Sequence, residues 1–160
     1  MEKINIFDSF LPDYQCKYIF DYCVSSSYNY GEVDFLNGPV TGMVHNIPFD
    51  HEVFETISHS ISSNFDVVSN LNLMRMYVNC FSPYENPYFH IDGDDGITFL
   101  YYPQPGWQIN DGGETQFYVN GELFGVLPLE NRLVKFDVNI LHRATSFRDR
   151  HRFTVAIKYK

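Results

Sequence analysis

Residues 87–102 read Pro87-Tyr88-Phe89-His90-Ile91-Asp92-Gly93-Asp94-Asp95-Gly96-Ile97-Thr98-Phe99-Leu100-Tyr101-Tyr102 and contain the only His-x-Asp of the chain, just before a strand-like apolar run. On an extended backbone, side chains two residues apart point to the same face, so His90 and Asp92 converge. An imidazole and a carboxylate are two of the three groups that hold iron(II) on one face of an octahedron in many proteins. The segment therefore predicts two metal ligands and requires a second histidine from elsewhere.

The second histidine is predicted to be His142. It follows the apolar, strand-like run of residues 133–138 and precedes another strand-like run that ends at the C-terminus. Two imidazoles and one carboxylate leave three positions of an octahedral ion open to other ligands. His90, Asp92 and His142 are therefore the predicted ligands, and iron(II) is the predicted ion.

Short alternating segments separated by Gly, Pro, Asn and Asp dominate the chain from Leu71 onward. This pattern predicts a mainly β fold, a jelly roll or double-stranded β-helix, with N-terminal helices packed on one sheet. Apolar residues recur every three or four positions after Pro12-Asp13 and again over residues 50–64, which predicts those two helices. Eight strands are predicted at 73–81, 88–92, 97–102, 115–119, 123–127, 132–138, 142–147 and 152–159, with short pieces at 4–7 and around Met43.

Composition sets the outer limits of the prediction. The 160 residues are 44% hydrophobic, which suits one domain over residues 1–160 that buries about two-thirds of its unfolded surface. The formal net charge of −9 disfavours nucleic acid as a partner, because such binding depends on Lys and Arg at phosphates. No apolar run approaches the roughly 20 residues that span a membrane. Three cysteines without a metal-type spacing favour a reducing, cytoplasmic location.

The last predicted strand has two different faces. Its odd-numbered residues are large and apolar, whereas Arg152, Thr154 and Ala156 are polar or small. If the apolar face packs under the helices, Arg152 points into the roll, where a guanidinium without an anion is unfavourable. Arg152 is therefore predicted to bind a carboxylate ligand through its planar donor fork. The alternative is a rim arginine paired with Asp149 or Glu114.

At these residues the chain resembles the 2-oxoglutarate and iron(II) dependent dioxygenases, in particular the prolyl 4-hydroxylase-like branch. The resemblance covers residues 74–160 and implies a jelly roll with the metal inside its open mouth. Its motifs, in chain order, are His90-x-Asp92, Thr98-Phe99-Leu100-Tyr101-Tyr102, Trp107, Gly112-Gly113-Glu114-Thr115, Arg132-Leu133-Val134-x-Phe136, His142 and Arg152-Phe153-Thr154-Val155.

The resemblance also implies the cofactors. Iron(II) sits on the three ligands, 2-oxoglutarate chelates the iron, molecular oxygen takes the last position, and ascorbate is a candidate reductant. By resemblance, Tyr102 donates its hydroxyl to the distal carboxylate of 2-oxoglutarate beside Arg152. Strand alternation puts Thr98 on the face of Tyr102 and Thr154 on the face of Arg152, so both are further candidate contacts.

One position departs from the family pattern. Many relatives carry a tyrosine shortly before the first ligand histidine, where its hydroxyl helps to hold the cosubstrate. Phe81 stands at the nearest equivalent position here. Tyr77 or Asn79, on the same face of the predicted strand, is the candidate replacement.

Three functions remain open at this point. The first is a hydroxylase of C–H bonds, with a peptidyl-prolyl 4-hydroxylase as one candidate. The second is the same enzyme class acting on a free amino acid, another small molecule or a nucleobase. The third is a non-enzymatic jelly-roll binding module, which the cluster of four polar groups in one cavity disfavours. We therefore expect a protein, peptide or small-molecule substrate, and nothing in the sequence predicts an oligomeric state.

Overall fold

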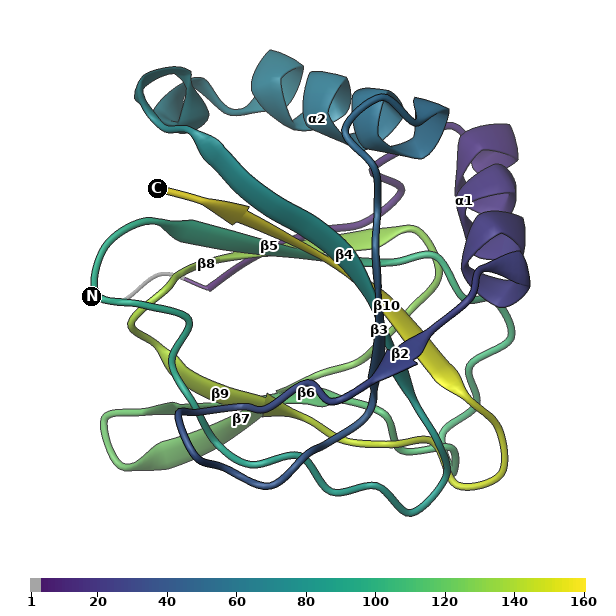
Figure 1. The fold of residues 1–160 in the computed structure, drawn as a ribbon, viewed down its shortest axis with the longest axis vertical. Helices are drawn as coiled ribbons and strands as arrows, with labels where there is room; N and C mark the ends of the chain where they lie inside the picture. The colour runs from purple at the N-terminus through teal and green to yellow at the C-terminus, as the bar shows by residue number, and fades with distance from the viewer. Residues whose placement is uncertain (1–3) are drawn as a thin grey trace.

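Two antiparallel sheets face each other in the computed structural model, which describes residues 4–160 (Figure 1). The larger sheet has the order β1-β8-β5-β10-β4-β3-β2, and the smaller has the order β7-β6-β9. This arrangement confirms the predicted jelly roll. The strands are β1 (Asn5–Phe7), β2 (Asn29–Tyr30), β3 (Met43–Asn46), β4 (Leu73–Phe81), β5 (Ile97–Tyr102), β6 (Thr115–Val119), β7 (Glu122–Val126), β8 (Arg132–Asp137), β9 (Leu141–Ala144) and β10 (Arg152–Tyr159).

Strand β10 lies in the middle of the larger sheet. It pairs with β4 on one side and with β5 on the other. Val155 and Ile157 are fully buried in the core on the helix side, whereas Arg152, Thr154 and Ala156 line a cavity inside the roll. The predicted alternation of β10 is confirmed, and it places a buried cation between the two sheets.

Two helices, α1 (Asp13–Ser25) and α2 (Glu52–Asn64), cover the outer face of the larger sheet (Figure 1). Helix α2 packs through Val53, Ile57 and Ile61, which are fully buried at a spacing of four residues. The side chain of His51 caps the start of α2 by accepting a hydrogen bond from the Val53 N–H at 3.1 Å. Burying each such side chain contributes about 1.5–3 kcal/mol, so the helices hold the sheet firmly. Within residues 4–160, no helix has the length and apolar character needed to cross a membrane.

One predicted strand is wrong. Residues 88–92 form no strand, and only an isolated bridge joins His90 to His142. Pro87 has no N–H to donate, and the Tyr88 N–H donates to Asp34 Oδ2 at 2.7 Å instead of to a neighbouring strand. The two-residue strand β2 also escaped prediction, because the loop around it is rich in Gly, Asn and Ser and has no clear alternation.

Candidate metal centre and anion pocket

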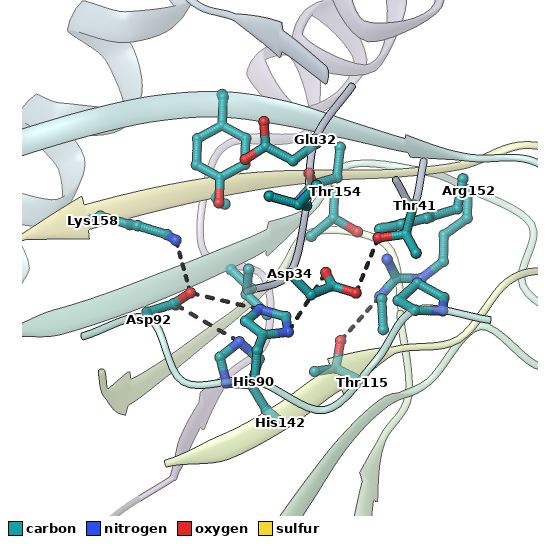
Figure 2. Close-up of a pocket in the computed structure, with 18 of the residues that line it drawn as sticks. Glu32, Asp34, Thr41, His90, Asp92, Thr115, His142, Arg152, Thr154 and Lys158 are labelled. Atoms are coloured by element: carbon teal, nitrogen blue, oxygen red, sulfur yellow. Dashed lines mark hydrogen bonds and ion pairs between the residues drawn. The ribbon is translucent and has the colours of Figure 1, made fainter. Parts of the chain in front are cut away.

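His90, Asp92 and His142 come together in one cavity, although they lie far apart in the sequence (Figure 2). The His90 N–H donates to the His142 carbonyl and the His142 N–H donates to the His90 carbonyl, both at 2.9 Å. Each Nε2 atom lies 3.7 Å from an oxygen of Asp92. The three candidate ligand atoms all lie within 4.8 Å of one another, so they surround a single point.

Backbone carbonyls orient both imidazole rings. Nδ1 of His142 lies 2.8 Å from the Ile140 carbonyl, and Nδ1 of His90 lies 3.0 Å from the Tyr88 carbonyl. We assign the proton of each ring to Nδ1, since a carbonyl oxygen can only accept, and this leaves both Nε2 lone pairs toward Asp92. Burial lowers the pKa of His142 to about 4. The ring is therefore neutral at pH 7, the form that binds a metal.

Two further side chains hold Asp92. Thr98 Oγ1 donates to Oδ2 at 2.6 Å, and Lys158 Nζ donates to Oδ1 at 2.7 Å. Burial alone would raise the pKa of Asp92, but His142, Lys158 and Thr98 together hold this pKa below its usual range. Asp92 is therefore ionised, and contacts of this kind fix the orientation of a metal ligand.

Arg152 is a cation that is only 1% exposed. Its Nε donates to the Gly113 carbonyl at 2.7 Å, and its Nη2 donates to Thr115 Oγ1 at 3.0 Å. Among residues 4–160 it forms no ion pair, so the alternative pairing with Asp149 or Glu114 is wrong. Burial lowers the pKa of Arg152, yet a guanidinium stays charged at neutral pH. Arg152 is thus a buried cation without an ion pair among residues 4–160, and a carboxylate ligand would balance its charge.

A cavity of about 220 Å³ joins the metal-ligand triad to Arg152 (Figure 2). Thr154 lines it, and the Thr154 hydroxyl is the buried side-chain polar atom of residues 4–160 that has no hydrogen-bond partner. A buried hydroxyl without a partner lowers stability by about 1–3 kcal/mol. Both Arg152 and Thr154 would be satisfied by a ligand carboxylate at this end of the cavity.

Comparisons with known proteins identify the fold. No protein-family model and no curated protein sequence matches the chain. A prolyl-4-hydroxylase from Pseudomonas putida matches with a TM-score of 0.78 at 18% identity, over 100% of this chain and 94% of that one. A Trichoplax adhaerens prolyl hydroxylase, in complex with a hypoxia inducible factor oxygen degradation domain peptide fragment, matches with a TM-score of 0.78 at 20% identity, over 98% and 82%.

HygX from Streptomyces hygroscopicus, with nickel and 2-oxoglutarate bound, matches with a TM-score of 0.75 at 10% identity, over 99% of this chain and 82% of that one. The fold is that of the 2-oxoglutarate and iron(II) oxygenases. The oxygenase fold extends over the N-terminal part of the chain, where the sequence showed no motif of the family. At these identities the likeness defines the fold alone, and the chemistry depends on the residues of the site.

Most of the predicted site residues line the cavity of this oxygenase fold. Tyr102 lies behind it: its buried hydroxyl is 2.7 Å from Thr115 Oγ1, which also accepts from Arg152. Thr98 was expected to contact 2-oxoglutarate, but its hydroxyl donates to Asp92 instead. The predicted residues that line the cavity are His90, Asp92, His142, Arg152, Thr154 and Tyr77.

Phe81 and Asn79 also line the cavity. The Arg152 guanidinium lies 6.0 Å from the centre of the Phe81 ring. The position where relatives carry a tyrosine thus offers an aromatic ring without a hydroxyl. Tyr77 lies four residues before Phe81 in β4 and also lines the cavity, where Lys158 Nζ is 5.5 Å from the Tyr77 ring centre.

Three charged residues of the cavity wall were not predicted: Glu32, Asp34 and Lys158. Asp34 and Glu32 belong to a loop whose placement depends on distant contacts, so no local pattern marks them. The sequence did indicate a position inside the roll for Lys158, because this residue shares the even-numbered face of β10 with Arg152. A lysine at the end of a strand is usually solvated, which is why this signal was missed.

The donor set of the triad fits iron(II). Two neutral imidazoles and one carboxylate on one side of an ion are the facial triad of non-haem iron oxygenases. The buried Arg152 and the unpartnered Thr154 hydroxyl fit the far carboxylate of a dicarboxylic acid that reaches the metal with its other end. Both cofactors implied by the resemblance therefore find matching residues.

Proposed function

We propose that the protein is an iron(II) and 2-oxoglutarate dependent dioxygenase that hydroxylates a C–H bond of its substrate. One observation carries the proposal: the two-histidine, one-carboxylate triad and the buried Arg152, which has no ion pair within residues 4–160, share one cavity. A structural metal site needs no buried cation beside it. A carboxylate cosubstrate does, because its charge must be balanced away from water.

The residues divide the task between them. His90, Asp92 and His142 hold the iron, and Arg152 binds the distal carboxylate of 2-oxoglutarate. Tyr102 keeps Thr115 in place beside the guanidinium. Further contacts to 2-oxoglutarate are assigned to the Thr154 hydroxyl, which has no other partner, and to Tyr77. Thr98, through its bond to Asp92, orients a metal ligand.

When bound, iron(II) and 2-oxoglutarate activate molecular oxygen, so that 2-oxoglutarate, O2 and a substrate C–H bond become succinate, carbon dioxide and a C–OH group. The chain contributes orientation of the cosubstrate, charge balance through Arg152 and exclusion of water from the cavity. Ascorbate is the candidate reductant that would keep the iron in the divalent state.

A prolyl residue of a peptide is one candidate substrate, because the Trichoplax neighbour was solved with a peptide fragment. A free small molecule is the other candidate. The opposite charges of Lys158 and Asp34 on the cavity wall favour the free small molecule.

The test is formation of succinate from 2-oxoglutarate by the purified protein with iron(II), ascorbate and air. We expect succinate only when iron(II) is present, and we expect a chelator such as EDTA to stop it. Succinate formation that is independent of iron would contradict the proposal. Measuring 2-oxoglutarate binding to the manganese-loaded protein under nitrogen separates loss of cosubstrate binding from loss of turnover.

A further inference from the structure

Two side chains of opposite charge face the cavity beside the triad, each next to one of the proposed metal ligands, and neither is assigned to 2-oxoglutarate (Figure 2). Lys158 comes from the end of β10, and Asp34 comes from the loop between β2 and β3. We propose that they bind the substrate, and that this substrate is a free α-amino acid: Lys158 takes its carboxylate and Asp34 its ammonium group. The inference rests on the proposed function, because it names the substrate class of the same site.

Lys158 shares its anion, Asp92, with the proposed metal site. Its Nζ donates to Asp92 Oδ1 at 2.7 Å, but a dication on the triad would draw on the same carboxylate and repel the ammonium group. Arg75, opposite Lys158 in the β4–β10 ladder, adds a second positive charge, and Glu32 already pairs with Arg75 at 2.9 and 3.3 Å. The flexible lysine is therefore the cation left to bind an incoming anion.

Asp34 is the matching anion. Its side chain is only 10% exposed, and its Oδ2 accepts from two neutral donors, the Tyr88 N–H at 2.7 Å and the Thr41 hydroxyl at 3.0 Å. Within residues 4–160 it forms no ion pair with a lysine or arginine, and the nearby His90 Nδ1, at 3.6 Å, belongs to a ring that is neutral when it binds a metal. A buried carboxylate of this kind is stabilised by a cationic ligand.

The balance of charge points to a zwitterion. The metal dication, Asp92, the two carboxylates of 2-oxoglutarate and Arg152 neutralise one another. Lys158 and Asp34 then remain as one cation and one anion in the same cavity. The amino and carboxylate groups of a free amino acid satisfy both of them, whereas an internal residue of a peptide has neither charge.

The size of the cavity agrees with a small substrate. Its volume of about 220 Å³ is below the roughly 300–1,000 Å³ of pockets for drug-sized ligands. Such a volume suits small acids. The competing explanation is that Lys158 and Asp34 only orient the metal ligands Asp92 and His90, so the experiment must separate substrate binding from support of the metal.

The experiment is calorimetric binding under nitrogen to the full chain loaded with manganese(II) and 2-oxoglutarate. The probes are the common L-amino acids, each with its α-carboxamide and its N-acetyl derivative, and a blocked proline-containing peptide. We expect at least one free amino acid to bind about tenfold or more tightly than both of its blocked derivatives and than the peptide. Preference for the blocked peptide, or no free amino acid bound, would overturn the inference while 2-oxoglutarate binding still supports the proposed function.

The variants distinguish recognition from metal support. Lys158→Met should lower the affinity for the free amino acid about tenfold or more but leave that for its carboxamide nearly unchanged, and Lys158→Arg should restore much of the loss. Asp34→Asn should likewise lower the affinity for the free amino acid about tenfold or more but leave the affinity for its N-acetyl derivative nearly unchanged. Equal losses for free and blocked forms, together with weaker manganese binding, would show that both residues serve only the metal ligands. Asp95→Asn, an exposed carboxylate outside the cavity, is the matched control and should change nothing.

A protein that binds manganese(II) but no 2-oxoglutarate would contradict the proposed function, and the substrate inference would fall with it. A thermal unfolding curve for each variant confirms that the fold is intact. The binding data then report on the cavity alone.

Discussion

The two faces of β10 contribute differently to stability and to binding. On the helix side, Val155 and Ile157 are fully buried among apolar neighbours and need no polar partner. On the cavity side, the same strand presents Arg152, Thr154 and Lys158, which are two cations and a buried hydroxyl without a partner. The outer face therefore contributes stability, and the inner face lowers stability to provide binding groups. Mutations on the two faces should separate folding from function.

The largest effect should come from the triad. His142→Ala removes one of the two imidazoles, and we expect iron affinity to fall by at least about a hundredfold and succinate formation to disappear. The free energy of unfolding of the metal-free protein should change much less than for a buried apolar truncation. Iron titration and chemical denaturation measure the two quantities, and full turnover in this variant would remove His142 from the metal site.

A truncation on the outer face should have the opposite profile. Ile157→Ala removes a fully buried side chain and should lower the free energy of unfolding by about 3 kcal/mol. The affinity of the folded variant for 2-oxoglutarate should stay within about twofold of the wild-type value, because Ile157 faces away from the cavity. Denaturant melts and calorimetry at low temperature check both; a large loss of cosubstrate affinity would mean that the faces are not independent.

Arg152→Met tests the cavity face of β10. Loss of the charge-assisted bonds to a carboxylate should weaken 2-oxoglutarate binding about a hundredfold. The free energy of unfolding without ligands should stay the same or rise, since a buried unpaired cation is replaced by an apolar chain of similar length. Arg148→Met, at an exposed position, is the control for charge alone, and an unchanged affinity in Arg152→Met would place the anion site elsewhere.

The smallest effect should be a pH dependence of the metal-free protein. Burial holds the pKa of His142 at about 4, below the usual 6.5, so the unfolded chain takes up the proton first as the pH falls. The stability contributed by neutral His142 is complete above pH 6.5 and is lost toward pH 4, by about 2 kcal/mol at pH 5. Denaturant melts at pH 7 and pH 5 measure it. The drop should be smaller in His142→Gln, and equal drops in both proteins would assign it to other groups.

The local pattern of the sequence was sufficient for the inward and outward faces of β10 and β5. Alternation predicted that Arg152 and Tyr102 point inward, and both are buried inside the roll. These predictions succeeded because strand geometry alone decides which side chains share a face. His90 and His142 were predicted as ligands of one metal ion, and a single backbone bridge brings them together in place of the strand expected over residues 88–92.

Tertiary contacts place the cavity residues that the sequence did not predict. Asp34 reaches the cavity because the backbone of Tyr88 and the hydroxyl of Thr41 hold its carboxylate. Neither contact leaves a periodic mark in a loop rich in glycine and asparagine. Lys158 lies on the predicted inner face, but only Asp92, itself placed by the fold, turns a strand-end lysine into part of a site.

In the proposed enzyme, one metal ion and one dicarboxylate meet between the triad and Arg152. Calorimetric titration of 2-oxoglutarate into the protein under nitrogen, with and without manganese(II), tests it most directly. We expect each chain to bind a single 2-oxoglutarate, tightly only when manganese is present, and we expect Arg152→Met to weaken this binding. Equally tight binding without metal, or binding indifferent to Arg152, would contradict it.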